Sequence, residues 1–346
     1  MESGLPPQFA LSRRSPNGAR LAFIKAACAV AEGAHVVRDG AGSCVAAALD
    51  DPQCRVCVMG GRQGLPRSLG SVYAGSVVRF LGGFVGQQRR VVLMPGSLPV
   101  CGTVTVTRDG SLLLILGTFG FAFGLHVFRG ADGVFLRTIG CEGGRDGPLQ
   151  FRRPRQVNIS PDDFVFVADS GNQRIVVLTP QFDFHGFVGV HRLASPSGVC
   201  ADERRVFVSE LSCCIKTFRR CDGAFVGRFG RFGAGDGQLW NPLGLCMIHK
   251  SHCVAVAEDK NNRISVFTLE GDFVRHVGVG ELAGPRTVAC ASLGDELVVA
   301  DSDNCVCVSH TTGEILHTLQ TGRFSSIAIH GDTVYELRVG KCVVFT

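Results

Sequence analysis

Residues 154–189 read PRQVNISPDDFVFVADSGNQRIVVLTPQFDFHGFVG, and this stretch contains four short apolar runs. The runs cover 157–159, 164–168, 175–178 and 184–188, and each is alternating or continuously apolar, which is typical of strands. The segments between them are rich in proline, aspartate, glycine and asparagine, which favour turns. We therefore predict a four-stranded antiparallel unit. Such a unit is too small to bury a core alone, so it should repeat.

The same pattern recurs along most of the chain. Complete units occupy 104–140, 154–189, 195–230, 241–278 and 284–318, and three further strands are predicted at 325–329, 333–337 and 341–345. A period of about 40 to 50 residues is typical of four-stranded propeller blades. The high hydrophobic content, 45%, suits strands that are buried on both faces of their sheets.

The turn between the second and third predicted strands carries a recognisable motif. Ala168-Asp169-Ser-Gly-Asn172-Gln-Arg174-Ile175 resembles the A-D-x-x-N-x-R-I core of NHL repeats, and the stretches 143–151 and 233–240 resemble the glycine-rich links of that family. The resemblance covers about residues 76–346. It implies an all-β fold, a six-bladed β-propeller of four-stranded antiparallel blades, preceded by an irregular N-terminal extension at 1–75.

Closure of the ring is predicted from the strands left over. The last unit, up to Phe345, has only three strands, whereas the run at 77–82 looks like the glycine-ended fourth strands of other units. We expect 77–82 to pair with 341–345, because this pairing would remove an open sheet edge.

The extension at 1–75 carries no copy of the repeat. Its apolar run at 21–30 is interrupted by Lys25 and is too short to span a bilayer, so no membrane contact is expected. Arginines before this run leave a targeting peptide as an alternative, but the prolines and the long lead-in argue against cleavage there. We expect a poorly ordered or loosely packed segment.

Cysteine is abundant, with sixteen in the chain. Six of them lie at predicted strand positions, where cysteine acts as a small buried hydrophobe, namely Cys200, Cys246, Cys290, Cys305, Cys307 and Cys342. We therefore expect reduced thiols and a cytoplasmic protein. Cys54 and Cys57 have the spacing of half a zinc knuckle without a second half. We predict no metal site and no cofactor. The chain also lacks the RING-like cysteine and histidine array that many NHL ubiquitin ligases carry.

The charged residues of the repeated turn are predicted to be structural. Aspartate after the second strand and arginine before the third can bond across a tight turn. The set comprises Asp169, Asn172, Arg174, Glu258, Arg263 and Asp301. Cys214 and Cys305 take the arginine position in two other units, and Gly124 takes it in the first, so the motif is eroded.

The loops before the first strands and the turns after the second strands should share one face. Basic and aromatic residues gather there, namely Arg152, Arg153, Arg155, Arg192, Trp240, Lys260, Arg263 and Arg286. Such residues form hot spots for proteins and can also hold an RNA backbone. We predict a monomer that docks a protein partner on this face. The family resemblance adds a role as an adaptor in ubiquitin-ligase-type complexes, and RNA binding is the alternative. The net charge of +5 does not demand nucleic acid.

Catalysis is the remaining alternative, since some propellers hold a metal on their axis. The expected axis-facing positions offer Gln156, Ser197, Asn241 and Arg286, which do not form a metal site of the lyase or hydrolase type. His249 and His252 fall in a turn on the opposite rim. No arrangement of nucleophile and base is visible, and no small-molecule substrate is evident, so we predict a protein that is not an enzyme.

Overall fold

Short antiparallel strands account for nearly all regular structure in the described part of the chain. The computed structural model describes residues 90–93, 102–119, 122–143, 147–290, 296–302, 304–320, 324–331, 333–338 and 341–345. They belong to a unit that spans Arg89–Phe345. A 3-10 turn, at Ser170–Asn172, follows β9 (Val165–Asp169). No helix found among the described residues is long and apolar enough to cross a membrane.

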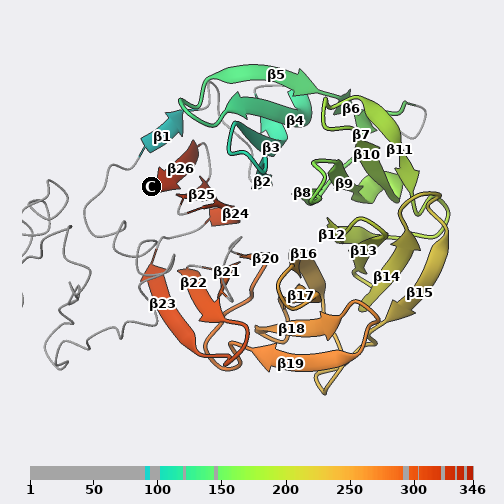
Figure 1. The fold of residues 1–346 in the computed structure, drawn as a ribbon, viewed down its shortest axis with the longest axis vertical. Coiled ribbons are helices and arrows are strands. Elements are labelled where there is room, and N and C mark those ends of the chain that lie inside the picture. Colours follow the sequence, from blue (N-terminus) through green and yellow to red (C-terminus); the bar gives the residue numbers. More distant parts are fainter. Residues whose placement is uncertain are drawn as a thin grey trace, which may run out of the picture. The chain divides into compact units, whose positions relative to one another are not determined.

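Five sheets are each formed by four consecutive strands, arranged as blades around a common centre (Figure 1). The first two are β2 (Thr103–Val106), β3 (Leu112–Phe119), β4 (Ala122–Arg129) and β5 (Phe135–Ile139), and β8 (Val157–Ile159), β9 (Val165–Asp169), β10 (Arg174–Leu178) and β11 (Phe184–Val188). The next two are β12 (Pro196–Ala201), β13 (Arg205–Glu210), β14 (Cys214–Arg219) and β15 (Phe225–Phe229), and β16 (Pro242–Ile248), β17 (Cys253–Glu258), β18 (Arg263–Thr268) and β19 (Phe273–Val277). The fifth is β20 (Thr287–Cys290), β21 (Glu296–Ala300), β22 (Asn304–Ser309) and β23 (Ile315–Gln320).

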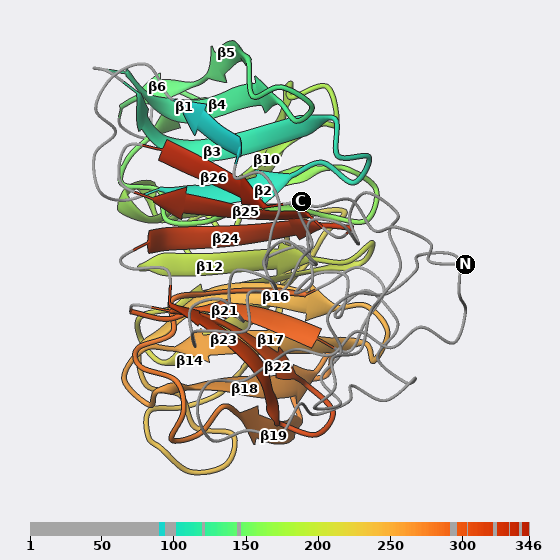
Figure 2. The same ribbon diagram turned by 90° about the vertical axis from the view of Figure 1, so that its left-hand side faces the viewer.

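A further four-stranded sheet joins the two ends of the unit. It combines β24 (Phe324–His330), β25 (Thr333–Arg338) and β26 (Lys341–Phe345) with β1 (Arg90–Leu93), in the order β1-β26-β25-β24. Arg90 lies opposite Val344, and Leu93 lies opposite Lys341. Figure 2 shows β1 beside β26.

This pairing corrects the predicted closing strand. Both sides of β26 are occupied, by β25 and β1, so the closing strand is 90–93. The run at 77–82 and the predicted extension at 1–75 lie outside the described residues. Chain length explains the difference. β1 ends ten positions before β2 begins, the same separation as between Val277 and Thr287, whereas 77–82 would leave a longer link than any other in the ring.

The hydrophobic core lies between neighbouring blades. One cluster packs the first blade against the β24–β26 sheet. Its members include Val104, Leu113, Phe128, Ala328 and Leu337. Other clusters occupy the interfaces between successive blades. This explains why the second and third strands are continuously buried while the fourth strands are half exposed. Each blade therefore depends on its neighbours for burial.

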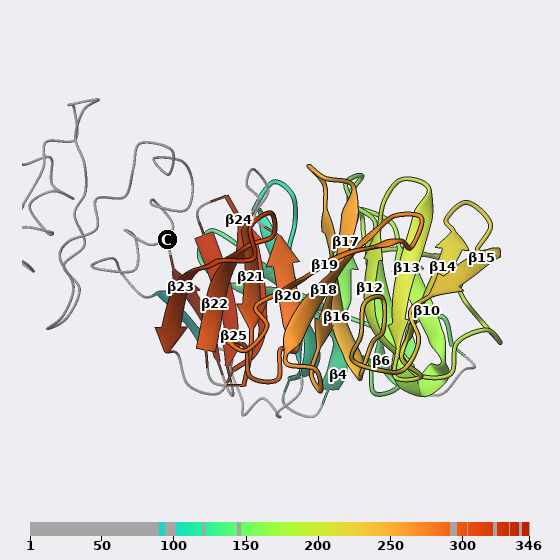
Figure 3. The same ribbon diagram turned by 90° about the horizontal axis from the view of Figure 1, so that it is seen from below.

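The strands run between two edges of the ring (Figure 3), so the loops form two separate faces. Each first strand starts on the face where each second strand ends, because the strands are antiparallel. We call this the link face, since it carries the links that join the fourth strand of one blade to the first strand of the next. A short parallel pair, β6 (Cys141–Glu142) with β7 (Gln150–Phe151), lies within one of these links.

Candidate functional site

A carboxylate at the end of each of four second strands bonds to the link that precedes its blade. Asp169 accepts the backbone N–H of Arg152 at 2.7 Å, and Glu210 accepts that of Ala194 at 2.6 Å. Glu258 accepts the N–H of Trp240 at 3.0 Å, and Asp301 that of Ala283 at 3.3 Å. All four carboxylates belong to buried residues. Their shared role is to fix the links against the blades.

In the second blade, arginine and asparagine complete this contact. Arg174 donates from Nε to Asp169 Oδ2 at 3.0 Å, and Asn172 donates to the same oxygen at 2.8 Å. Both side chains also donate to the link carbonyl of Gln150, at 2.7 and 3.0 Å. Burial raises the pKa of Asp169, and hydrogen bonds from Arg152, Asn172 and Arg174 oppose that rise. The predicted ion pair is present, and it holds the link as well as the turn.

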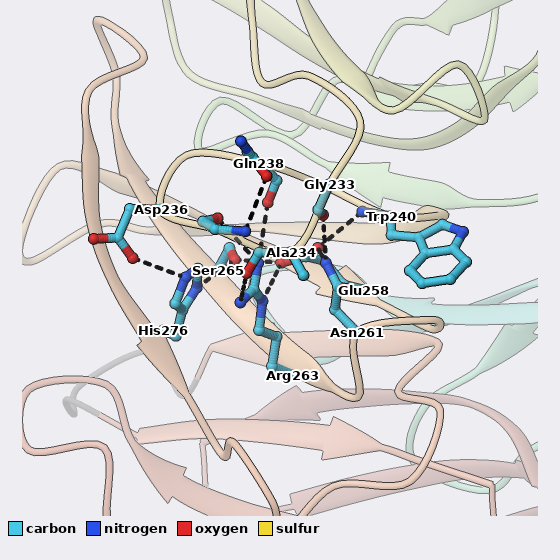
Figure 4. Close-up of polar contacts among 11 residues, drawn as sticks. Gly233, Ala234, Asp236, Gln238, Trp240, Glu258, Asn261, Arg263, Ser265 and His276 are labelled. Carbon is cyan, nitrogen blue, oxygen red and sulfur yellow. Dashed lines mark hydrogen bonds and ion pairs between the residues drawn. The ribbon is translucent and has the colours of Figure 1, made fainter.

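The fourth blade repeats the arrangement with glutamate (Figure 4). Arg263 donates to Glu258 at 2.9 Å and to the link carbonyls of Ala234 and Gln238 at 2.7 and 3.1 Å. Asn261 donates to Glu258 at 2.6 Å and to Gly233 O at 2.9 Å. These bonds hold the link at both ends of its glycine-rich segment.

The same network extends outward to the fourth strand. The Ser265 hydroxyl donates to Glu258 and contacts His276 Nδ1 at 2.9 Å, while His276 Nε2 lies 3.3 Å from Asp236 of the link (Figure 4). Burial and the Arg263 guanidinium lower the pKa of His276. Ser265 is fully buried, so this serine–histidine–aspartate array is structural and not an accessible nucleophile.

Two further blades show how the motif has changed. Lys216 lies 2.6 Å from Glu210, so a lysine farther along the third strand supplies the cation that Cys214 cannot. Sequence comparison of the turns missed Lys216 because it is displaced from the motif position. Asn304, not Cys305, lies opposite Asp301 and donates its backbone N–H to that carboxylate at 2.8 Å. The turn in this blade is shorter, which shifted the predicted alignment.

The predicted binding residues do not all reach solvent. Arg152, Arg153, Arg155, Arg192, Trp240, Lys260 and Arg286 are exposed on the link face. Arg263 is only 6% exposed and its donors are committed to Glu258 and the link, so its inclusion in the binding face was wrong. Lys260 is paired with Asp259 at 3.2 Å, which partly neutralises its charge.

Five of the predicted binding residues have no ion pair to a carboxylate of the described part of the chain, namely Arg152, Arg153, Arg155, Arg192 and Arg286. Arg155 and Arg286 occupy equivalent positions, directly after the proline that leads the first strand. Their backbone N–H groups donate to Ala168 O and Ala300 O at 2.9 and 2.8 Å. The guanidinium of Arg192 lies 5.9 Å from the Phe225 ring.

An exposed aromatic pair lies on the same face. Phe232 is 65% and Trp240 44% exposed, and their rings pack edge to face with centroids 5.5 Å apart. Both belong to the link fixed by Arg263, and Figure 4 shows the Trp240 indole directed away from the polar network. Phe232 and the neighbouring exposed Arg231 were not among the predicted binding residues. The RF dipeptide directly after the glycine that ends the fourth strand could have indicated them.

Near the centre of the ring, polar side chains bond neighbouring first strands. Gln156 donates to Leu245 O at 2.9 Å and accepts N–H groups from Val199 and Leu245 at 3.0 and 3.1 Å. The amide oxygen therefore accepts two backbone N–H groups, and the amide nitrogen donates to one carbonyl. His249 and His252 lie in the β16–β17 turn, on the opposite face. Within the described ranges, no group of three or more metal-ligating side chains lies close together, and Cys54 and Cys57 fall outside those ranges.

Ten cysteines whose side chains the structure describes form no disulfide. Cys200 and Cys246 are buried on first strands, and burial raises the pKa of both thiols. Burial also raises the pKa of Cys307 to about 12. These three side chains are neutral thiols at neutral pH and pack as small hydrophobes.

Comparisons with known proteins agree with the repeat pattern over short stretches. No family model matches the chain. A stretch of 46 residues is 41% identical to Protein lin-41 of Caenorhabditis elegans, covering 13% of this chain and 4% of that protein. A stretch of 76 residues is 40% identical to RING finger protein nhl-1 of the same organism, covering 22% and 8%. This chain thus matches less than a tenth of the length of either relative.

Among solved structures, a streptogramin B lyase resembles this chain with a TM-score of 0.54 and 14% sequence identity, covering 72% of this chain and 80% of that one. Identity this low shows the fold alone. The repeat motif and the two short sequence matches make this chain similar to NHL-repeat proteins, and the likeness to the lyase structure shows that its fold is a β-propeller.

Proposed function

We propose that the link face docks a protein partner and that the chain has no chemistry of its own. The observation that carries this proposal is the combination of five exposed arginines without carboxylate partners and the exposed Phe232–Trp240 pair. Arginine and tryptophan are the residues most enriched in interface hot spots. The similarity to NHL-repeat proteins supports the same function. Stoichiometric zinc or calcium in the purified protein would contradict the non-catalytic part of the proposal.

A more specific role follows from the same similarity. We propose a monomeric, six-bladed, cytoplasmic adaptor that brings its partner to ubiquitin-ligase-type complexes. One of the relatives is named a RING finger protein, and free, buried thiols suit a reducing compartment. A captured ligase subunit that depends on the link face would support the adaptor role.

The test uses the full chain as bait in quantitative affinity capture, with RNase-treated extract. The variant is Arg153→Ala/Arg155→Ala/Arg286→Ala. The control is Arg129→Ala/Arg204→Ala/Arg219→Ala, whose arginines lie at loops of the opposite face. Proteins lost with the first variant and retained with the control are the expected result. Equal capture by all three baits would overturn the proposal.

RNA is the second candidate, because guanidinium groups also bind phosphates. RNA binding by the purified chain that weakens steeply with salt and disappears in the first triple variant would favour it.

A further inference from the structure

The link face is positive because the carboxylates of its repeated turns are buried and bonded to backbone N–H groups. Asp169, Glu210, Glu258 and Asp301 are all buried and accept backbone N–H groups of the links. Among the described residues, the exposed acids of this face are few. Asp236 contacts His276, and Asp259 bonds Lys260 and Asn241. Glu142 is exposed in the link before β8, and Glu281 is exposed in the link before β20.

The exposed arginines of this face, in contrast, have no carboxylate partners among the described residues. Arg205 and Arg220, at loops of the opposite face, are paired with Glu270 and Asp162 at 3.0 and 2.6 Å. Arg152, Arg153, Arg155, Arg192 and Arg286 of the link face have no such partners within the described ranges. Unpaired exposed guanidinium groups are ready to bind carboxylates in the bidentate geometry that arginine favours.

These cations follow an arc across four neighbouring blades. Arg152, Arg153 and Arg155 precede β8, Arg192 precedes β12, and Arg286 precedes β20, with the Phe232–Trp240 pair before β16. The corresponding first strands are neighbours in the ring (Figure 1). An extended segment that follows the arc would meet cations on both sides of one apolar anchor.

The anchor is held in place before any partner arrives. Arg263, Asn261 and Glu258 bond the link at Ala234, Gly233 and Trp240, so little order need be gained on binding. Phe232 and Trp240 pack edge to face against each other and form a single apolar site. Single-stranded RNA platforms instead present successive aromatic faces for stacking. A second exposed aromatic pair, Phe184 with Phe187, belongs to the outer strand β11 and not to a link. The described links therefore present one aromatic site, which favours a peptide.

We propose that the link face binds an acidic, extended peptide segment, with carboxylates on the arginines and one apolar side chain against Phe232 and Trp240. This inference rests on the proposed protein-docking function and names the chemistry of the partner.

The experiment titrates the full chain with a fluorescent peptide of alternating glutamate and aspartate around one central leucine. The matched peptide carries glutamine and asparagine instead. A third probe is an oligouridine RNA. Peptide anisotropy measures binding, and emission from Trp240, the single tryptophan of the chain, reports contact at the anchor. The variants are Arg155→Ala/Arg286→Ala and Phe232→Ala. The control is Arg129→Ala/Arg219→Ala, and thermal unfolding checks that each variant folds.

The expected result is binding of the acidic peptide alone, with a change in Trp240 emission. Affinity should fall about tenfold in each link-face variant, equivalent to about 1.4 kcal/mol, and stay unchanged in the control. Equal binding of the amide peptide, equal binding by the arginine variant, or binding of the RNA alone would overturn the inference. Loss of acidic-peptide binding alongside arginine-dependent capture of proteins would sink this inference while leaving the docking function intact.

Discussion

At the scale of single residues, the acid of the repeated turn is more persistent than the cation. Four blades keep a buried carboxylate that accepts a link N–H. The cation beside it is Arg174, Lys216 or Arg263 in three of these blades, and Asn304 occupies the turn position beside Asp301 in the fourth. The backbone N–H of the link must be satisfied in every blade. A cation is needed only where the acid would otherwise be buried with too few donors.

Arg263→Ala should be strongly destabilising. The change leaves Glu258 buried without its ion pair and the carbonyls of Ala234 and Gln238 without a donor. We expect the free energy of unfolding to fall by about 3 to 5 kcal/mol. Urea unfolding followed by Trp240 emission measures this loss. Arg219 forms an ion pair with Asp222, and its side chain is more than half exposed. Arg219→Ala should therefore lower the free energy of unfolding by less than about 1 kcal/mol. Similar losses in both variants would contradict the structural role of Arg263.

The ion pair between Asp162 and Arg220 should make stability depend on acid pH. Arg220 donates to both carboxylate oxygens, at 2.7 and 2.6 Å, and this hydrogen bonding lowers the pKa of Asp162 below 3.8. The folded state therefore holds the proton less tightly than the unfolded chain. The stabilisation is complete above the unfolded pKa and is lost as the pH falls through the folded pKa.

Asp162→Asn should therefore be less stable than the wild type near neutral pH and closer to it near about pH 3. The expected difference is about 1 kcal/mol or less, because the Asp162 side chain is 43% exposed and screened by water. Unfolding in urea at both pH values measures it. A difference that stays constant with pH would argue against this pair.

At the scale of elements, the close approach of first strands near the axis requires glycine. A Cβ on Gly198 would lie 2.2 Å from Leu243 O and 2.9 Å from Leu245 N, both backbone atoms of the next blade. Gly198→Ala should lower the free energy of unfolding by about 1 to 3 kcal/mol, since neither strand can yield easily. Thermal or urea unfolding provides the measurement.

Gly227→Ala is the matched control, because no atom lies within 4 Å of a Cβ at that position. This variant should be neutral or slightly more stable. If both glycine variants unfold alike, strand contact near the axis does not constrain Gly198.

The positions of many strands could be predicted from the sequence. Apolar runs bounded by turn residues predict strands such as β9 and β10, since both are continuously buried. The closing strand could not be predicted in the same way. Its selection depends on link length and on a partner at the far end of the chain, which periodicity does not encode. The burial of Arg263 and the exposure of Phe232 likewise depend on a link folding back onto a blade.

At the scale of the whole molecule, stability is shared between neighbours, and the ends of the ring need one another. The first blade buries Val104 and Leu113 against Leu337 of the β24–β26 sheet, and β1 pairs with β26. Removing that sheet would leave the apolar side of the first blade and the edge of β1 open. Exposed patches and open edges of this kind promote association.

A chain ending at Gln320 should therefore form oligomers or aggregates and bind hydrophobic dyes. Light scattering after gel filtration measures the first effect and dye fluorescence the second. Leu337→Ala provides a milder comparison, because it keeps β1 paired while opening a cavity in the same cluster. It should remain monomeric and lose about 2 to 5 kcal/mol of stability. A truncated chain that stays monomeric and unfolds cooperatively would show that the five blades formed from consecutive strands are stable without closure, and the β1–β26 pairing would then be dispensable.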